Sequence, residues 1–233
     1  MVNGLALALE NGMKEYINKI SEPVIRAYKK ETNDQIFKAL EVIFKREYTP
    51  VARNLICTEL VLSLNNALLK SDIMERRIQG IKCINEQVMD RMVLEKVVSI
   101  KKSKEMIYQW VQTNNIIDEI YGKRGHLQLI QRSVQILKLY YKFNETLPLD
   151  IIWSQIEDPH TKLEIYSNLR ICISLFSAAM TESVINKIIE YKPDRQLGFD
   201  DLDIIVDMFN TKYEHMPNAS QIAGVLMDNV CSN

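Results

Sequence analysis

Cysteine and histidine are the residue types in this 233-residue sequence that could support nucleophilic catalysis. A thiol hydrolase needs a cysteine activated by a histidine, usually with an orienting Asn or Asp. No cysteine here lies in a glycine- or asparagine-rich loop that opens a helix, and the histidines fall near predicted helix starts or in connectors. We therefore expect structural or solvent-exposed roles for Cys57, Cys83, Cys172, Cys231, His126, His160 and His215.

Metal, nucleotide and acid/base sites are not indicated either. The sequence contains no H-E-x-x-H, no C-x-x-C pair, no glycine-rich phosphate loop and no G-x-S-x-G elbow. Glu157 and Asp158 are adjacent carboxylates, but their position before Pro159 is better explained by helix capping than by acid/base catalysis. We expect no catalytic residue, no metal and no cofactor in this chain.

A group of basic residues is the candidate partner-binding site. From Lys70 to Lys142 there are 14 Lys and Arg against 8 Asp and Glu, although the whole chain has a formal net charge of -1. A solvated polar face is the alternative explanation. The candidates form two connectors that could lie at the same end of the fold: Lys101, Lys102 and Lys104 in one, Lys123 and Arg124 in the other.

Nucleic-acid binding would combine such cations with stacking aromatic rings. Tyr108, Trp110 and Tyr121 lie near the basic group in the sequence, but they fall on predicted helix faces, so we expect them in the core. A net charge close to zero also gives no field that would gather nucleic acid. Protein partners are therefore favoured over nucleic acid.

Long helices joined by short connectors are predicted for the scaffold that carries these residues. The chain is 47% hydrophobic, has only 7 Gly and 6 Pro, and lacks the frequent turn signals of an all-β protein. Asp158 followed by Pro159 predicts one helix start, and Ser71 with Asp72 predicts another. Gly80, inside a helical pattern, predicts that a neighbouring backbone approaches closely.

Apolar residues recur at helical spacing on more than one side of several segments. His126 to Phe143 is predicted as one long helix, and a helix running past Trp110 is expected to end near Gly122. Residues 163–176 show the same broad pattern. A helix that is apolar on several sides must be covered by several neighbours. A shorter amphipathic helix with an acidic first turn is expected from Asp200 to Phe209.

The predicted fold class is all-α, an irregular armadillo/HEAT-like stack of helical hairpins. A compact helical bundle stays an alternative, because periodicity alone does not separate the two. We expect a single helical-repeat domain over 1–233, with 194–233 as a short acidic helical end. The longest uncharged apolar run near the start, Leu5 to Leu9, is too short to cross a membrane, so a cytoplasmic or nuclear location is expected.

Four pieces of the sequence follow one another in an order and spacing typical of one family. They are IMERRIQGIKCINEQV from Ile73, WVQTNNIIDEIYG from Trp110, IQRSVQILKLYYKF from Ile130, and LDIIW from Leu149 with His160 after it. Over about Ile73 to Pro193 the chain resembles the non-catalytic helical-repeat region of the large fat-facets-type ubiquitin carboxyl-terminal hydrolases. It departs from them where their Lys-His-Glu reads Pro159-His160-Thr161, and their catalytic domain is absent from these 233 residues.

The resemblance implies a module that selects substrates or docks partners for ubiquitin removal and carries no peptidase residue. Its partners would be other proteins, ubiquitin-pathway substrates among them, and Trp110 and Trp153 would be packing anchors. Two other hypotheses stay open. The chain could be an unrelated helical adaptor in transport or RNA metabolism, or a fragment of a full-length ubiquitin-specific cysteine protease.

Overall fold

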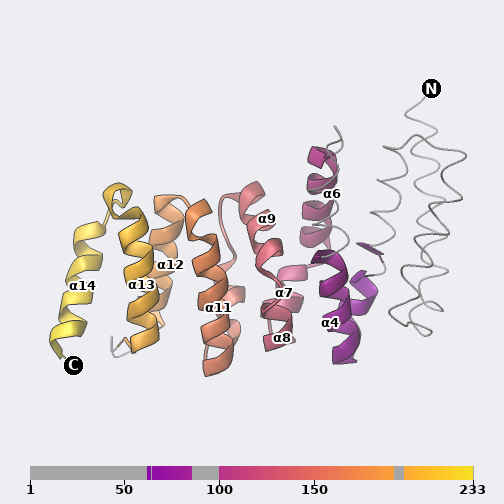
Figure 1. The fold of residues 1–233 in the computed structure, drawn as a ribbon, viewed down its shortest axis with the longest axis horizontal. Coiled ribbons are helices and arrows are strands. Elements are labelled where there is room, and N and C mark those ends of the chain that lie inside the picture. Colours follow the sequence, from indigo (N-terminus) through magenta and orange to yellow (C-terminus); the bar gives the residue numbers. More distant parts are fainter. Residues whose placement is uncertain (1–61, 64, 86–99, 192–196, 233) are drawn as a thin grey trace, which may run out of the picture. The chain divides into compact units, whose positions relative to one another are not determined.

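The computed structural model describes residues 62–63, 65–85, 100–191 and 197–232, with the backbone alone at 100–103 and 229–232. The chain divides into two compact units, 1–114 and 115–233. Within the described ranges every regular element is a helix and no strand occurs (Figure 1). The all-α prediction is confirmed, whereas the arrangement into hairpin repeats stays a prediction.

In the first unit, α4 (Met74–Cys83) has its N-cap two residues after Ser71 and one after Asp72, the two residues predicted to cap it. The Ser71 hydroxyl accepts a hydrogen bond from the Ile73 N–H at 3.2 Å, and Ile73 itself occupies the N-cap position. Gly80 lies on the buried side of α4, where an added Cβ would stand 3.1 Å from Leu68 Cβ. The same Cβ would stand 3.3 Å from the Asn65 carbonyl oxygen, so the predicted close approach of a neighbouring backbone is confirmed.

The helix that contains Trp110, α6 (Ile100–Thr113), ends earlier than predicted. The Asn114 side chain donates a hydrogen bond to the Trp110 carbonyl at 3.0 Å, and Asn115 adopts a left-handed conformation with φ of 53°. Asparagine tolerates this conformation because its short side chain can hydrogen-bond locally. The backbone therefore leaves the helix before α7 (Ile116–Tyr121), and the prediction of one uninterrupted helix is wrong.

The second unit is built from α7 and the helices that follow it, with short 3-10 turns after α10, α11 and α13. These helices are α8 (Leu127–Ile130), α9 (Val134–Asn144), α10 (Leu149–Ile152), α11 (Pro159–Cys172), α12 (Ala178–Glu190), α13 (Phe199–Lys212) and α14 (Ala219–Ser232). As predicted, Asp158 caps α11 and Pro159 is its first residue. The Asp158 carboxylate accepts a hydrogen bond from the Thr161 N–H at 2.7 Å.

The long helix predicted over 126–143 is interrupted at Ser133, so that prediction is wrong. The Ser133 hydroxyl donates to the Ile130 carbonyl at 2.7 Å and is itself hydrogen-bonded by the Tyr121 hydroxyl. Asn168 Nδ2 donates to the same carbonyl at 2.7 Å. These buried side chains satisfy a carbonyl that a continuous helix would have paired with the N–H four residues further on.

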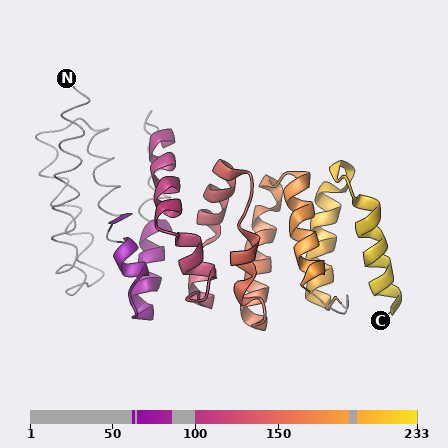
Figure 2. The ribbon, with the colours of Figure 1, turned by 180° about the vertical axis from the view of Figure 1, so that it is seen from behind.

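Helices α11 and α13 lie side by side and run in the same direction (Figures 1 and 2). Near the start of both helices, Lys162 and Tyr166 contact Asp201, at 3.1 Å and 2.8 Å. Further along both, Arg170 Nε lies 2.9 Å from an Asp207 oxygen. Because residues later in α11 contact residues later in α13, the two helices are parallel.

Helix α12 packs against α13 and runs in the opposite direction. Asn218, which follows α13, donates a side-chain hydrogen bond to Glu182 near the start of α12. The inward faces of the two helices carry the apolar side chains that are almost completely buried: Val184, Ile185, Ile188, Ile204, Ile205 and Met208.

Candidate protein-binding face of helices α11 and α13

Helix α11 and the turn after it carry a row of exposed apolar side chains on the side opposite their buried face. Leu163, Ile171 and Leu175 are each about half exposed, at 47, 49 and 50%. Ser167 is exposed between them, so the row follows the four-residue spacing of one side of a helix. Single exposed leucines are common on protein surfaces, but several large apolar side chains on one side of a helix are typical of a surface that packs against something else.

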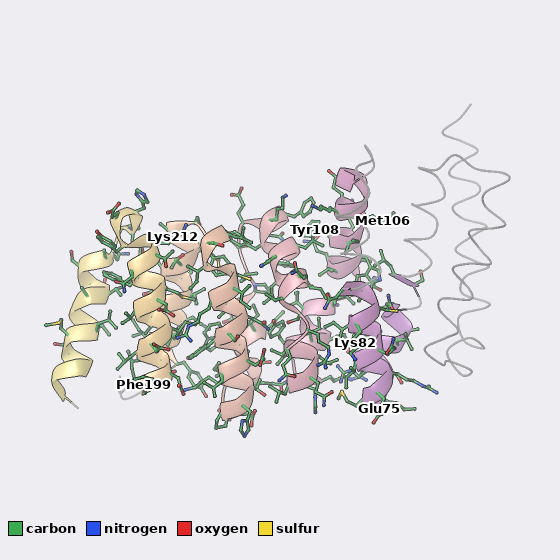
Figure 3. All side chains as sticks on the ribbon, viewed as in Figure 1. Glu75, Lys82, Met106, Tyr108, Phe199 and Lys212 are labelled. Carbon is green, nitrogen blue, oxygen red and sulfur yellow. The ribbon has the colours of Figure 1, made fainter. Side chains whose placement is uncertain are left out.

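A second row runs along α13 at a different spacing. Phe199, the first residue of the helix, is 83% exposed, and Val206 and Tyr213 follow at intervals of seven with 43 and 48% exposed. Leu202 and Phe209 lie between them and are partly buried. Figure 3 labels Phe199 at the start of α13 and Lys212 at its end. Alternating steps of three and four place all five apolar residues on one side of the helix.

Six of the seven large hydrophobic side chains exposed in the described part of the second unit belong to these two rows. We call them the α11–α13 face, which consists of Leu163, Ile171, Leu175, Phe199, Val206 and Tyr213. Both helices also bury apolar residues, which hold them against the core of the unit. On α13 these include Ile204 and Met208, which are completely buried. Each helix thus carries apolar residues on two sides. One side packs in the core of the unit, and the other is exposed.

Charges border the two apolar rows. Arg170 forms ion pairs with Asp203 and Asp207, and both carboxylates remain about half exposed. Apart from the buried Asp201, residues 199–215 carry four acidic side chains against one lysine, Lys212. Exposed ion pairs contribute little to stability. The acidic border is therefore expected to matter mainly for the choice and orientation of a partner.

A buried carboxylate fixes the start of α13 and with it the position of Phe199. Asp201 is fully buried and accepts hydrogen bonds from the Tyr166 hydroxyl at 2.8 Å, the Lys162 ammonium at 3.1 Å and the Gly198 N–H at 3.0 Å. Burial by itself would raise the pKa of Asp201, but these hydrogen bonds and the Lys162 charge outweigh it, so the pKa is lowered. The carboxylate therefore stays ionised and joins α11 to α13.

The predicted basic site is not assembled within either unit. Lys104 lies in α6 of the first unit, where the side chains of Lys101 and Lys102 are outside the described residues. Lys123 and Arg124 are exposed in the turn after α7, in the second unit, and Arg124 lies 3.9 Å from a Glu119 oxygen. The basic binding site therefore stays a prediction.

The described cysteines and histidines occupy structural or exposed positions. Cys83 and Cys172 are buried, and burial raises the pKa of the Cys172 thiol to about 11 although the Lys138 charge opposes it. His126 is the N-cap of α8 and accepts a hydrogen bond from the Gln128 N–H at 3.2 Å. His160 and His215 are exposed. Cys57 and the side chain of Cys231 lie outside the described residues.

Tyr121 and Trp110 are buried as predicted, and Tyr108 is partly buried. Trp153, also buried, lines a surface depression of about 310 Å³ together with Asp150, Lys187, Glu190 and Tyr191. Lys187 forms an ion pair with Asp150 across it. Among the residues that the structure describes, no cysteine or histidine lines the depression, and the Trp153 Nε1 atom is enclosed by protein atoms, out of reach of a molecule in it.

Among the described residues, no group of three or more His, Cys, Asp or Glu side chains is placed to hold a metal ion. The helices described are all too short or too polar to cross a membrane. No protein-family model matches the sequence, and no curated protein or solved structure matches it significantly.

The α11–α13 face was not identified from the sequence, although one signal for it was present. Phe199, Leu202, Val206, Phe209 and Tyr213 show the alternating three- and four-residue spacing of a helix that packs against another helix. The helical spacing and the acidic first turn predict an amphipathic helix there, but they do not separate this row from the apolar residues of the core.

Proposed function

We propose that this chain is a non-catalytic helical scaffold that binds other proteins through the α11–α13 face. The observation that carries the proposal is the concentration of exposed large apolar side chains on two parallel, adjacent helices. Burying such side chains against a partner contributes roughly 25 cal/mol for each Å² of apolar surface removed from water. Because the helices are held by their own core, little ordering of the backbone would oppose binding.

Within this proposal the helices form an armadillo/HEAT-like stack, and the chain serves ubiquitin removal by docking substrates or partners. The parallel α11 and α13 with the antiparallel α12 are consistent with consecutive helical hairpins. The resemblance to fat-facets-type hydrolases is the support for the ubiquitin pathway. An unrelated helical adaptor and a fragment of a full-length ubiquitin-specific cysteine protease remain the competing hypotheses.

Quantitative affinity capture from cells tests the docking face. We compare the full chain with two double variants, Leu163→Ser with Ile171→Ser, and Phe199→Ser with Val206→Ser. All four side chains are exposed, so the variants should keep the helix content of the parent, which far-UV circular dichroism checks. Proteins enriched by the parent chain should be lost with at least one of the two variants.

The matched control is Lys123→Ser with Arg124→Ser, which alters two exposed residues of the same unit away from the face. This control should retain the enriched proteins. If both apolar variants retain them and the control loses them, the docking face is wrong and the basic connector is the binding site.

The absence of catalysis is tested separately with a ubiquitin-amide reporter. The purified chain should produce no turnover at any concentration. Turnover that disappears when Cys57, Cys83, Cys172 or Cys231 is replaced by alanine would refute a non-catalytic scaffold and favour the protease hypothesis.

A further inference from the structure

The row along α13 has the geometry of one side of a two-helix contact. Its five apolar residues span Phe199 to Tyr213, about 21 Å at 1.5 Å per residue. Their alternating spacing of three and four is the pattern that interlocks with a second helix, because side chains at this spacing fit between those of a helix running alongside. The Phe209 and Tyr213 rings stack with centroids 6.0 Å apart, which gives one end of the row a wide apolar surface.

The charge around the row defines the chemistry of that second helix. Asp203 and Asp207 pair with Arg170 yet remain about half exposed, and Asp200 and Glu214 add further negative charge at the two ends. A partner helix with lysine or arginine beside its apolar positions would pair with these carboxylates. A partner helix with acidic flanks would be repelled.

The same charges disfavour a second copy of this row as the occupant. Two α13 helices packed face to face and antiparallel would bring the side that carries Asp203 and Asp207 on one copy against the same side of the other. Like charges held together across an interface disfavour association. The occupant is therefore sought in another protein.

We infer that the Phe199 to Tyr213 row of α13 binds a basic amphipathic helix of a partner protein. This inference rests on the proposed function and gives it a partner class. The partner helix presents large apolar residues at alternating three- and four-residue spacing over about four turns, with Lys or Arg on the side of that row that faces Asp203 and Asp207.

A displayed library tests this partner class without knowledge of the natural partner. The library holds helical peptides with a fixed apolar row at heptad spacing and random residues at the flanking positions, and the bait is the full 233-residue chain. Selected peptides should carry Lys or Arg at the flanks. Selection of acidic or uncharged flanks, or of no binder at all, overturns the inference.

A selected peptide is then measured by fluorescence anisotropy against the variants. Phe199→Ser with Val206→Ser should weaken binding at least tenfold. The matched control, Ile73→Ser, removes an exposed apolar side chain from the first unit and should leave binding unchanged. Asp203→Asn with Asp207→Asn should reduce the preference for a lysine-flanked over a glutamate-flanked peptide severalfold, a change that lost apolar contact alone would not produce.

Two further results separate this inference from the proposed function. If captured cellular proteins are lost with Leu163→Ser and Ile171→Ser but kept with Phe199→Ser and Val206→Ser, the docking face stands and the helix on α13 is wrong. If both variants keep them, both proposals are wrong. Sedimentation that shows a concentration-dependent dimer, abolished by Phe199→Ser with Val206→Ser, would make a second copy the occupant and overturn the inference.

Discussion

Replacing Asp201 by asparagine tests how α13 is held against α11. The carboxylate accepts hydrogen bonds from the Tyr166 hydroxyl, the Lys162 ammonium and the Gly198 N–H, and it is fully buried. An asparagine at this position keeps one acceptor oxygen but turns an NH2 group toward one of these donors. The charge-assisted hydrogen bond, worth about 1.5–3 kcal/mol, is lost, and an unsatisfied buried donor costs about 1–3 kcal/mol more.

We expect Asp201→Asn to lower the free energy of unfolding by about 2–4 kcal/mol, toward the lower part of the sum because the Lys162 side chain, 15% exposed, can turn its ammonium to water. For a chain of this length that corresponds to roughly 5–15 °C in Tm. Thermal and urea unfolding followed by far-UV circular dichroism measure the change. Tyr166→Phe should cost about 1 kcal/mol, and a double-mutant cycle gives the coupling between the two residues.

Asp200→Asn is the matched control, since Asp200 is the adjacent carboxylate in the first turn of α13 and interacts with the helix dipole. It should cost less than about 1 kcal/mol. Equal destabilisation by Asp200→Asn and Asp201→Asn would show that the buried network does not hold the two helices, and the reasoning would fail.

Three other predictions concern titration, packing and thiol reactivity. The pKa of Asp201 is lower in the folded chain than its usual value of about 3.9. The contribution of Asp201 to stability is therefore complete above that usual value and is lost as pH falls through the folded pKa. The difference in free energy of unfolding between the parent and Asp201→Asn should be constant from about pH 7 to 5 and shrink below about pH 4. A difference that grows on acidification would contradict this sign. Gly224→Ala should raise the free energy of unfolding by up to about 1 kcal/mol, because nothing lies within 4 Å of the added Cβ. Gly80→Ala should lower the free energy of unfolding, because the added Cβ would meet Leu68 Cβ at 3.1 Å and Leu69 Cγ at 3.2 Å, and overpacking costs about 1–3 kcal/mol. Urea titrations in which both alanine substitutions change the free energy of unfolding in the same direction would refute the packing argument. Cys172, buried and with a pKa of about 11, should be alkylated by iodoacetamide far more slowly in the native chain than in urea, as peptide mass mapping can show; equal rates would mean that the thiol is accessible.

Local signals in the sequence located the start of α11 and one close contact. The Asp158-Pro159 pair begins α11 as predicted, because a carboxylate cap and a proline at the first position act within one turn and need no tertiary partner. Gly80 was predicted to face a neighbour for a similar reason, since a glycine in a helix is costly unless space requires it.

The breaks within predicted helices depended on contacts between distant segments. Ser133 interrupts the segment 126–143 because Tyr121 from α7 and Asn168 from α11 join it in one buried hydrogen-bonded group. A serine between Arg132 and Val134 gives no sign of such partners in the sequence. Asn114 and Asn115 are residues that can end a helix, but two asparagines are also compatible with a continuous helix.

The sequence by itself determined that this chain is helical, because the spacing of its apolar residues, its few glycines and its capping pairs act over a few residues. Which side of α13 faces solvent was decided by the tertiary structure. Ile204, Ile205 and Met208 are as apolar as Phe199, Val206 and Tyr213, and only the packing of α12 and α11 against one side makes the first group core. The exposed face follows from that packing, because a helix apolar on two sides is covered only where neighbours of its own chain reach it.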